Sequence, residues 1–255
     1  NIYPPLSEQM FLYNKGDYLK YFEKRGVPIA PTFLIKKDRD PQKMIQKVHQ
    51  NNWDAFVVKP DYAFANIEIA KYDLKDVDSM ISESYYSTEN TYDSITESYY
   101  STSSNPKIRE ELDKYLKVNK KFPGFTFQEK MQGFAKFWEV KSFWLNGEYK
   151  YHVAMKAWPP PESFGSISKT DLERLKKLGR KVLKNMPKTK IKGKIVKPLF
   201  VRIDFGCCQG NTLDKSKYFL NEIEYAGCGT FTDVKNVFHY WPKVFYEKAK
   251  EINGI

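Results

Sequence analysis

The chain has 255 residues, of which 41% are hydrophobic and 29% charged, a composition typical of a globular protein with one large domain or two small ones. No apolar run approaches the roughly 20 residues that a membrane span needs, no signal peptide is visible, and three cysteines without a CxxC motif argue against a disulfide framework or a zinc site. The formal net charge of +11 indicates an anionic partner.

That partner is predicted to be a nucleotide, a polyphosphate or an acidic peptide. A nucleic acid is less favoured, because lysine dominates over arginine, which is the preferred residue for bidentate phosphate and base contacts. The cysteine usage predicts a reducing, cytoplasmic (intracellular) location.

The first half of the chain is predicted to alternate helices with short strands. Residues 1–14 are expected to be irregular, because they contain Pro4 and Pro5. Apolar spacing predicts helices over Gly16–Arg25, Pro41–Asn51 and Pro106–Val118, and strands over Thr32–Ile35, Ala55–Lys59 and Ile67–Ala70. The segment at about 78–105 repeats a Ser-Tyr-Tyr-Ser-Thr motif and has few aliphatic side chains, so we expect a low-complexity insertion.

The second half is predicted to be rich in hairpins. Asn146-Gly147 is a strong two-residue turn signal between strands. The predicted strands are Phe125–Met131, Trp138–Leu145, Glu148–Lys156, Leu199–Phe205 and Tyr218–Ile223, and the predicted helices are Thr170–Met186 and Val234–Ile252. The resulting fold class is α+β with mainly antiparallel sheets.

Three carboxylates lie on the last predicted hairpin. Asp204 interrupts an apolar strand, and Glu222 and Glu224, two residues apart, share a face of the next strand. Oxygen ligands of this kind suit Mg2+ or Mn2+ that also binds phosphates. The alternative is that they are ordinary acidic residues on a solvent-facing strand.

The order of elements from about Asn14 to Phe231 resembles the ATP-grasp superfamily. Asn14-Lys15 and the later Gly-Val-Pro-Ile-Ala-Pro-Thr resemble the entry segment of that family, and Val57-Val58-Lys59-Pro60 resembles its lysine strand. By this resemblance Lys15 and Lys59 contact nucleotide phosphates. The remaining implied cofactor-binding residues are Gln128, Glu129, Lys130 and Met131 on the hinge strand and Glu139 after it, the catalytic residues are Lys141, Lys156 and Arg202, and the metal ligands are Asp204, Glu222 and Glu224. Arg202 is expected to point away from the face that carries Asp204.

The resemblance also implies a domain plan. Residues 1–30 would lead into the fold, 31–124 would form the small lobe with the insertion, and 125–255 would form the large lobe with the metal site, with the nucleotide bound between two α/β lobes. Two features depart from the family. The flap after the lysine strand, residues 61–66, has no glycine, and only 14 residues precede Lys15, where family members usually carry an N-terminal domain.

The implied function is an ATP- and Mg2+-dependent ligase that activates a carboxylate as an acyl phosphate for attack by an amine or thiol. The partners would be ATP, a carboxylate substrate and an amine or thiol acceptor, with an acidic peptide as one candidate, and no membrane. Two alternatives stay open. One is a kinase that phosphorylates a highly anionic hydroxyl acceptor such as an inositol phosphate, and the other is a degenerate, non-catalytic binding domain.

Overall fold

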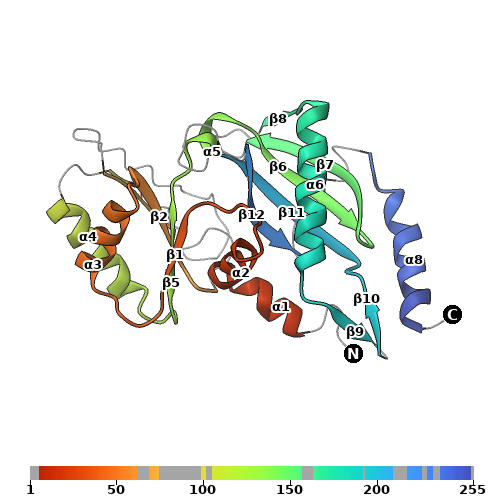
Figure 1. Cartoon of the computed structure of the whole chain (residues 1–255), viewed down its shortest axis with the longest axis horizontal. Coiled ribbons are helices and arrows are strands. Elements are labelled where there is room, and N and C mark those ends of the chain that lie inside the picture. The colour runs from red at the N-terminus through yellow and green to blue at the C-terminus, as the bar shows by residue number, and fades with distance from the viewer. Residues whose placement is uncertain are drawn as a thin grey trace, which may run out of the picture. The chain divides into compact units, whose positions relative to one another are not determined.

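The computed structural model describes residues 6–62, 69–74, 99–101, 105–156, 163–191, 193–208, 217–225, 229–231 and 236–253. The chain divides into two compact units (Figure 1). We call them the Lys59 unit, which comprises Tyr13–Asp17 and Ala30–Lys130, and the Asp204 unit, which comprises Asn1–Leu12, Tyr18–Ile29 and Met131–Ile255.

The Lys59 unit contains a five-stranded sheet with the order β1-β5-β2-β3-β4. Its strands are β1 (Thr32–Ile35), β2 (Ala55–Pro60), β3 (Ala70–Asp73), β4 (Tyr99–Ser101) and β5 (Phe125–Glu129), and only the β3–β4 pair is parallel. Helices α3 (Pro41–Gln50) and α4 (Asn105–Val118) cover one face, where Phe56 and Val58 are fully buried in their core cluster. Because side chains alternate along a strand, Lys59 lies on the opposite face.

The Asp204 unit contains a second five-stranded sheet with the order β12-β11-β6-β7-β8, in which all neighbouring strands are antiparallel. Its strands are β6 (Glu139–Leu145), β7 (Glu148–Lys156), β8 (Ser163–Gly165), β11 (Phe200–Cys207) and β12 (Tyr218–Glu224), and β9 (Thr189–Ile191) pairs separately with β10 (Lys194–Val196). The helices are α1 (Leu6–Tyr13), α2 (Lys15–Glu23), whose first turn belongs to the other unit, α5 (Gln132–Lys136), α6 (Lys169–Asn185) and α8 (Tyr240–Asn253).

Helix α6 lies across one face of this second sheet (Figure 1). Its buried side chains Leu175 and Val182 pack into the same core cluster as Trp144 and Ile203. Gly179 allows the close approach, because a Cβ at this position would lie 2.2 Å from Cζ2 of Trp144. We call the opposite face of this sheet the site face.

Several predicted elements are confirmed. Strand β1 has the predicted bounds, and α3, α4, α6 and the β6–β7 hairpin lie within two residues of theirs. The turn residues Asn146 and Gly147 both have positive φ angles, 51° and 78°, as a two-residue hairpin turn requires.

Other expectations are wrong. Residues 6–13 form α1 rather than irregular chain, and β3 begins at Ala70, where the prediction ended it. The last helix begins at Tyr240, six residues later than predicted. Strand β5, which the domain plan placed in the large lobe, pairs with β1 and β2 and so belongs to the Lys59 unit.

The predicted insertion at 78–105 lies mostly outside the described residues. Its described part forms β4, which adds a parallel edge strand next to β3, and the first residue of α4. Within the described residues, no helix combines the length and apolar character that would let it cross a membrane.

Candidate functional site

Six charged residues gather on the site face of the Asp204 unit. The register aligns Lys141 of β6, Asp204 of β11 and Glu222 of β12 across three neighbouring strands. Two residues along, Arg202 faces Glu224 in the same way. With Glu139, which also lies on this face, these residues form what we call the charged cluster, namely Glu139, Lys141, Arg202, Asp204, Glu222 and Glu224.

Asp204 is the centre of the charged cluster, and its side chain is almost fully buried. The Arg202 guanidinium donates to both carboxylate oxygens, with Nε 2.8 Å from Oδ1 and Nη2 2.9 Å from Oδ2. Lys141 Nζ adds a third donor 2.9 Å from Oδ2 and also lies 3.0 Å from Glu139. Arg202 Nη2 lies 3.1 Å from Glu224. Two cations are thus shared among three carboxylates.

The expected orientation of Arg202 is therefore wrong. Residues two apart on a strand point to the same face, and the two-pronged ion pair between Arg202 and Asp204 follows from that spacing. As a result, Arg202 directly orients the Asp204 carboxylate.

The electrostatics of the charged cluster are reflected in two pKa shifts. Burial lowers the pKa of Lys141, but the charges of Asp204 and Glu139 outweigh burial and raise it above its usual range. The pKa of Tyr18 is raised by burial and then by the charges of Glu222, Asp204 and Glu224. All three predicted metal ligands therefore act on one buried hydroxyl, which accepts a hydrogen bond from the Ile223 amide at 3.3 Å.

Tyr18 lies within the predicted helix Gly16–Arg25, and the sequence carries no separate signal for its hydroxyl. The predicted site also lacked Asn221, which donates to Glu139 at 3.0 Å. Asn221 is the extra residue of a bulge in β12, since Asp204 pairs with Glu222 while Phe205 pairs with Leu220. Alternation alone would have assigned Asn221 to the other face.

The charged cluster has the donor chemistry for a hard cation. An ionised carboxylate offers about four lone-pair sites, and three are taken at Asp204 by Arg202 and Lys141. Four of the six residues of the charged cluster are carboxylates, and carboxylate oxygens are ligands that Mg2+ prefers. Among the described residues, however, no three His, Cys, Asp or Glu side chains converge on one point as metal ligands. The Mg2+ site at Asp204, Glu222 and Glu224 therefore stays a prediction, which rests on the carboxylate chemistry of these residues and on the sheet face that they share.

Lys156 and Met131 belong to the same unit as the charged cluster. Lys156 Nζ donates to the Lys136 carbonyl at 2.9 Å and lies 5.3 Å from the centre of the Trp138 ring. Met131 is buried and directly precedes α5. Lys156 is therefore held at the junction of α5 and β6.

In the Lys59 unit, Lys15 and Lys59 approach one face of the sheet. Thr126 of β5 pairs with Lys59 of β2, so both face away from the helices. Gly16 packs against Thr126 so tightly that a Cβ would lie 2.1 Å from its Oγ1. This contact places the first turn of α2, which begins with Lys15, on the face that carries Lys59.

The predicted hinge residues end strand β5. Gln128 lies on the same face as Lys59 and donates to Thr32 Oγ1 at 3.1 Å. Glu129 is buried, and its amide donates to the Pro31 carbonyl. The Lys130 amide donates to the Ala55 carbonyl, and the Lys130 ammonium lies 3.8 Å from Asp73. The chain passes from one unit to the other directly after Lys130.

A second ion-pair group joins the segments that carry Lys15 and Lys59. Lys36 Nζ lies 2.6 Å from Asp61 and 3.2 Å from Asp17, and the Asp61 side chain is 1% exposed. Burial lowers the pKa of Lys36, but the hydrogen bonds and charges of Asp61 and Asp17 together outweigh burial and raise the pKa overall. We call Lys36, Asp61 and Asp17 the Lys36 clamp. Of the predicted flap, Asp61 and Tyr62 are described, and the rest lies outside the described residues.

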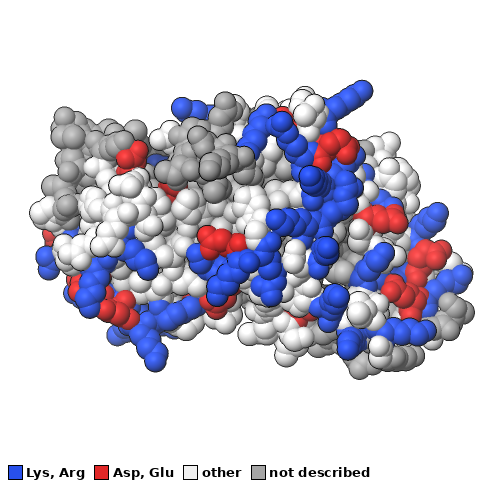
Figure 2. Space-filling model, in the orientation of Figure 1, with Lys and Arg blue, Asp and Glu red and all other residues white. Residues whose placement is uncertain are grey.

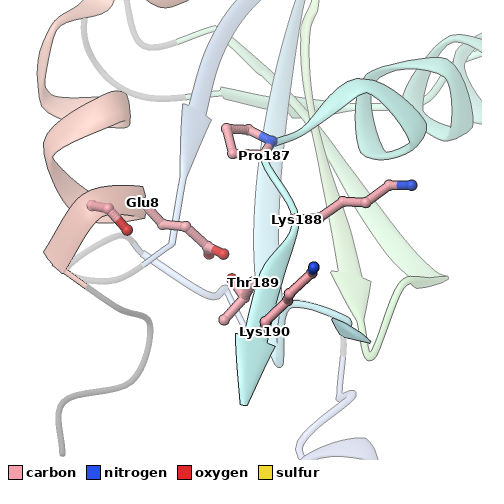
Figure 3. A pocket seen from close by; sticks show the side chains of 6 residues that line it. Glu8, Pro187, Lys188, Thr189 and Lys190 are labelled. Atoms are coloured by element: carbon pink, nitrogen blue, oxygen red, sulfur yellow. The ribbon is translucent and has the colours of Figure 1, made fainter. Parts of the chain in front are cut away.

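A small cavity of about 190 Å3 lies elsewhere in the Asp204 unit. It is lined by Ser7 and Glu8 of α1 and by residues 187–190 before and within β9, and Glu8 reaches from α1 toward Thr189 (Figure 3). Glu8 is 5% exposed, and its Oε1 has no hydrogen-bond partner among the described residues. Burial raises the pKa of this carboxyl. The cavity shares no residue with the charged cluster.

Comparisons with known proteins give matches at the level of structure only. No protein-family model matches the chain, and no curated protein sequence matches it. D-cycloserine synthetase DcsG superposes with a TM-score of 0.66 at 11% sequence identity over 95% of this chain. D-alanyl-alanine synthetase A from Vibrio cholerae superposes with a TM-score of 0.59 at 11% sequence identity over 94% of this chain. The ATP-grasp ligase PsnB, complexed with a minimal precursor, superposes with 0.57 at 12% over 96%.

The chain is shorter than these neighbours. It covers 72% of the DcsG chain, 65% of the Vibrio cholerae synthetase and 62% of PsnB. At identities of 11% to 12%, the superpositions establish the arrangement of helices and strands, and the chemistry has to be argued from the residues of this chain.

Proposed function

The chain has the ATP-grasp fold, and on that premise we propose that it is an ATP- and Mg2+-dependent ligase that activates a carboxylate for attack by an amine or thiol. The observation that carries this proposal is the charged cluster, in which Asp204, Glu222 and Glu224 share the site face of one sheet. The structural neighbours add support, because the D-alanine–D-alanine ligase from Bacillus anthracis was solved with ATP and PsnB with Mg and ADP.

The proposed chemistry has two steps. A carboxylate oxygen of the substrate attacks the terminal phosphorus of ATP, the bond to ADP breaks, and an acyl phosphate forms. The amine or thiol then attacks the carbonyl carbon, loses its proton, and phosphate leaves with the electrons of the C–O bond. Neither step needs a protein nucleophile, so positioning and charge neutralisation supply most of the acceleration.

In this proposal the lysines bind the phosphates. Lys15 and Lys59, which approach one face of the Lys59 unit, neutralise the charge of the nucleotide, and Lys156 acts on the phosphoryl group that is transferred. When bound, Mg2+ supplies further charge neutralisation at the phosphate oxygens. Glu222, Glu224 and the remaining lone pair of Asp204 would hold it.

Arg202 and Lys141 have a different proposed role from the lysines above. Both donate to Asp204, and Lys141 also to Glu139, so their charges are already balanced by carboxylates. We assign them to orienting the Asp204 carboxylate, because both hold it by charge-assisted hydrogen bonds. Gln128, Glu129, Lys130, Met131 and Glu139 remain the proposed surroundings of the nucleotide.

The first experiment is a thermal melt with ATP or a non-hydrolysable analogue, with and without Mg2+. A ligand at 100 times its dissociation constant stabilises the folded state by about 2.7 kcal/mol, which is readily measured. We expect ATP to raise the melting temperature in a way that depends on Mg2+. The rise should be smaller in Lys59→Ala and should no longer depend on Mg2+ in Glu222→Gln. Lys71→Ala, on the same sheet face one strand away, is the matched control for Lys59→Ala.

The outcomes separate the alternatives. Phosphate release that depends on an added carboxylate and amine supports the ligase. Transfer of label from ATP to an inositol phosphate, without ligation, would replace it with the kinase. No melting shift at millimolar nucleotide in the wild-type chain would rule out both and leave a non-catalytic binding domain.

A further inference from the structure

Helix α6 carries an unusual share of the charge of the protein. Its 17 residues include seven basic and two acidic side chains, a net charge of +5 out of the +11 of the whole chain. Figure 2 shows lysine and arginine side chains gathered over this helix. Helix α4 offers a comparison, because its 14 residues carry four basic and three acidic side chains.

The charge on α6 is concentrated on its outer face. Leu175, Gly179 and Val182 are buried against the sheet. Besides Lys169 in the first turn, the exposed basic side chains are Arg174, Lys177, Arg180, Lys181 and Lys184. Each of these five has another of them three or four residues away, which places like charges next to each other on one side of the helix.

These charges are poorly compensated within the described part of the chain, where Lys177, Arg180 and Lys184 form no ion pair. Glu173 pairs with Lys176 at 2.8 Å, and Asp171 lies 3.7 Å from Arg174. Like charges at three- and four-residue spacing destabilise a helix, so this pattern costs stability, and the described residues offer Lys177, Arg180 and Lys184 no ion pair that offsets the cost. A counter-charge supplied by a partner would remove that cost.

We propose that the outer face of α6 is a docking surface for an acidic peptide segment of a partner protein. Four of the six exposed basic side chains of α6 are lysines, and none of the exposed side chains on this helix is aromatic, so it offers no platform on which a nucleic-acid base would stack. Lysine ammonium groups on flexible stems can follow the carboxylates of an extended chain. Lys177 and Lys184 are about 10 Å apart along the helix axis, a length that three or four extended residues span.

This surface is separate from the charged cluster. The α6 side of the sheet carries Trp144 and Ile203, whereas Asp204 and Lys141 lie on the site face. A peptide on α6 therefore leaves the proposed ligase site open, and the inference does not depend on the proposed function. It predicts binding in the absence of any nucleotide.

The test is fluorescence anisotropy with a labelled peptide of about ten glutamates, without nucleotide, over a series of salt concentrations. An equally long glutamine peptide controls for the backbone. We expect binding at low salt that weakens steadily as salt is added, since exposed charges are screened.

Two matched triple variants locate the surface. Lys177→Glu, Arg180→Glu and Lys184→Glu change α6, and Lys107→Glu, Arg109→Glu and Lys114→Glu change the exposed face of α4. Each triple replaces two lysines and one arginine and lowers the net charge from +11 to +5. We expect the α6 triple to lose about tenfold or more in affinity and the α4 triple to stay within about twofold.

Equal losses in the two triples would show that overall charge, not α6, binds the peptide, and would overturn the proposal. Failure of the wild-type chain to bind the peptide at low salt would also overturn it. Single-stranded DNA that binds more tightly than the peptide, with the same loss in the α6 triple, would assign the surface to nucleic acid instead. Thermal melts followed by circular dichroism serve as the control that both triple variants are folded.

Discussion

At the scale of single residues, the charged cluster and the Lys36 clamp are both built around one buried aspartate. Asp204 is compensated by Arg202 and Lys141, and Asp61 by Lys36. A buried carboxylate is tolerated because its partners donate to it, and removing one member leaves an uncompensated charge. Substitutions here therefore change stability as well as activity, and the two effects have to be measured separately.

The first prediction compares two acids of the charged cluster. Asp204→Asn leaves Arg202 and Lys141 without their shared counter-charge, so we expect a loss of about 3 kcal/mol in the free energy of unfolding. Glu222→Gln, on the partly exposed edge strand, should cost less than about 1 kcal/mol. Urea unfolding at pH 7 measures both. Equal losses in the two variants would mean that Asp204 is not the centre of the ion-pair network.

The second prediction concerns the Lys36 clamp. Lys36→Met leaves Asp61 buried and unpaired, and because Lys36 itself is 41% exposed we expect a moderate loss of about 1–2 kcal/mol, again by urea unfolding. The matched control is Lys43→Met, which removes a pair of the same 2.6 Å length with Asp38 in which both side chains are exposed. Its midpoint should not change, because exposed ion pairs contribute little.

The same pair of variants tests whether the clamp matters for the nucleotide. It links the segment of Lys15 to the end of the strand that carries Lys59, so Lys36→Met should raise the KM for ATP with little change in kcat, and Lys36→Arg should restore it. An unchanged KM in Lys36→Met would limit the clamp to a role in stability.

At the scale of elements, the contact between α6 and the sheet depends on the absence of a side chain at Gly179. Gly179→Ala gains about 1 kcal/mol in helix propensity. The new Cβ would lie 2.2 Å from Trp144, and overpacking of this kind costs about 1–3 kcal/mol, so the net effect should be destabilising. The double variant Gly179→Ala with Trp144→Leu tests whether this clash is the cause. The smaller leucine makes room for the new Cβ, so in that background Gly179→Ala should increase the free energy of unfolding. If Gly179→Ala alone stabilises the protein, the close contact with Trp144 does not require a glycine at this position.

The sequence predicts most elements of the fold, because amphipathic spacing and turn chemistry act locally. Asn146-Gly147 fixes its hairpin, and the alternating apolar run of β11 identifies a strand. Helix α1 was missed because it is only eight residues long and follows two prolines, which favour an irregular segment. The β9–β10 hairpin carries a signal that was overlooked, since Thr-Lys-Ile-Lys alternates and Gly193 has the positive φ of a turn.

The sequence predicts which residues belong to the candidate site but not which of them pair with one another. The spacing of Glu222 and Glu224 predicts one shared face, and the register confirms that they lie opposite Asp204 and Arg202. Two ion pairs join residues that lie 25 or more apart in the sequence, namely Lys141 with Asp204 and Lys36 with Asp61. The position of Asn221 depends on one extra residue in a strand. No local pattern encodes them.

At the scale of the whole molecule, stability should depend on pH through Glu8. Burial raises the pKa of Glu8 in the folded state, so this state holds the proton more tightly than the unfolded chain does. Its contribution is therefore most favourable below the unfolded pKa of about 4.3 and falls as the pH rises through the folded value. Glu8→Gln should raise the free energy of unfolding by about 1 kcal/mol at pH 7 and by almost nothing near pH 3, below the unfolded pKa.

Urea unfolding at both pH values provides the measurement, and Glu173→Gln on the exposed face of α6 is the control. A difference between wild type and Glu8→Gln that is independent of pH would mean that the carboxyl is not protonated more readily in the folded state.

The intracellular location and the binding of nucleotide between two lobes stay predictions.

The packing of α6 has an optical consequence. Trp144 is 1% exposed beneath Gly179, and its indole N–H is held by Ser142 at 2.9 Å. A buried indole fluoresces at shorter wavelength than one in water, so Trp144 is a natural reporter of whether α6 stays on its sheet. A peptide that docks on the outer face should leave this emission in place, whereas any event that lifts the helix should shift it to the red.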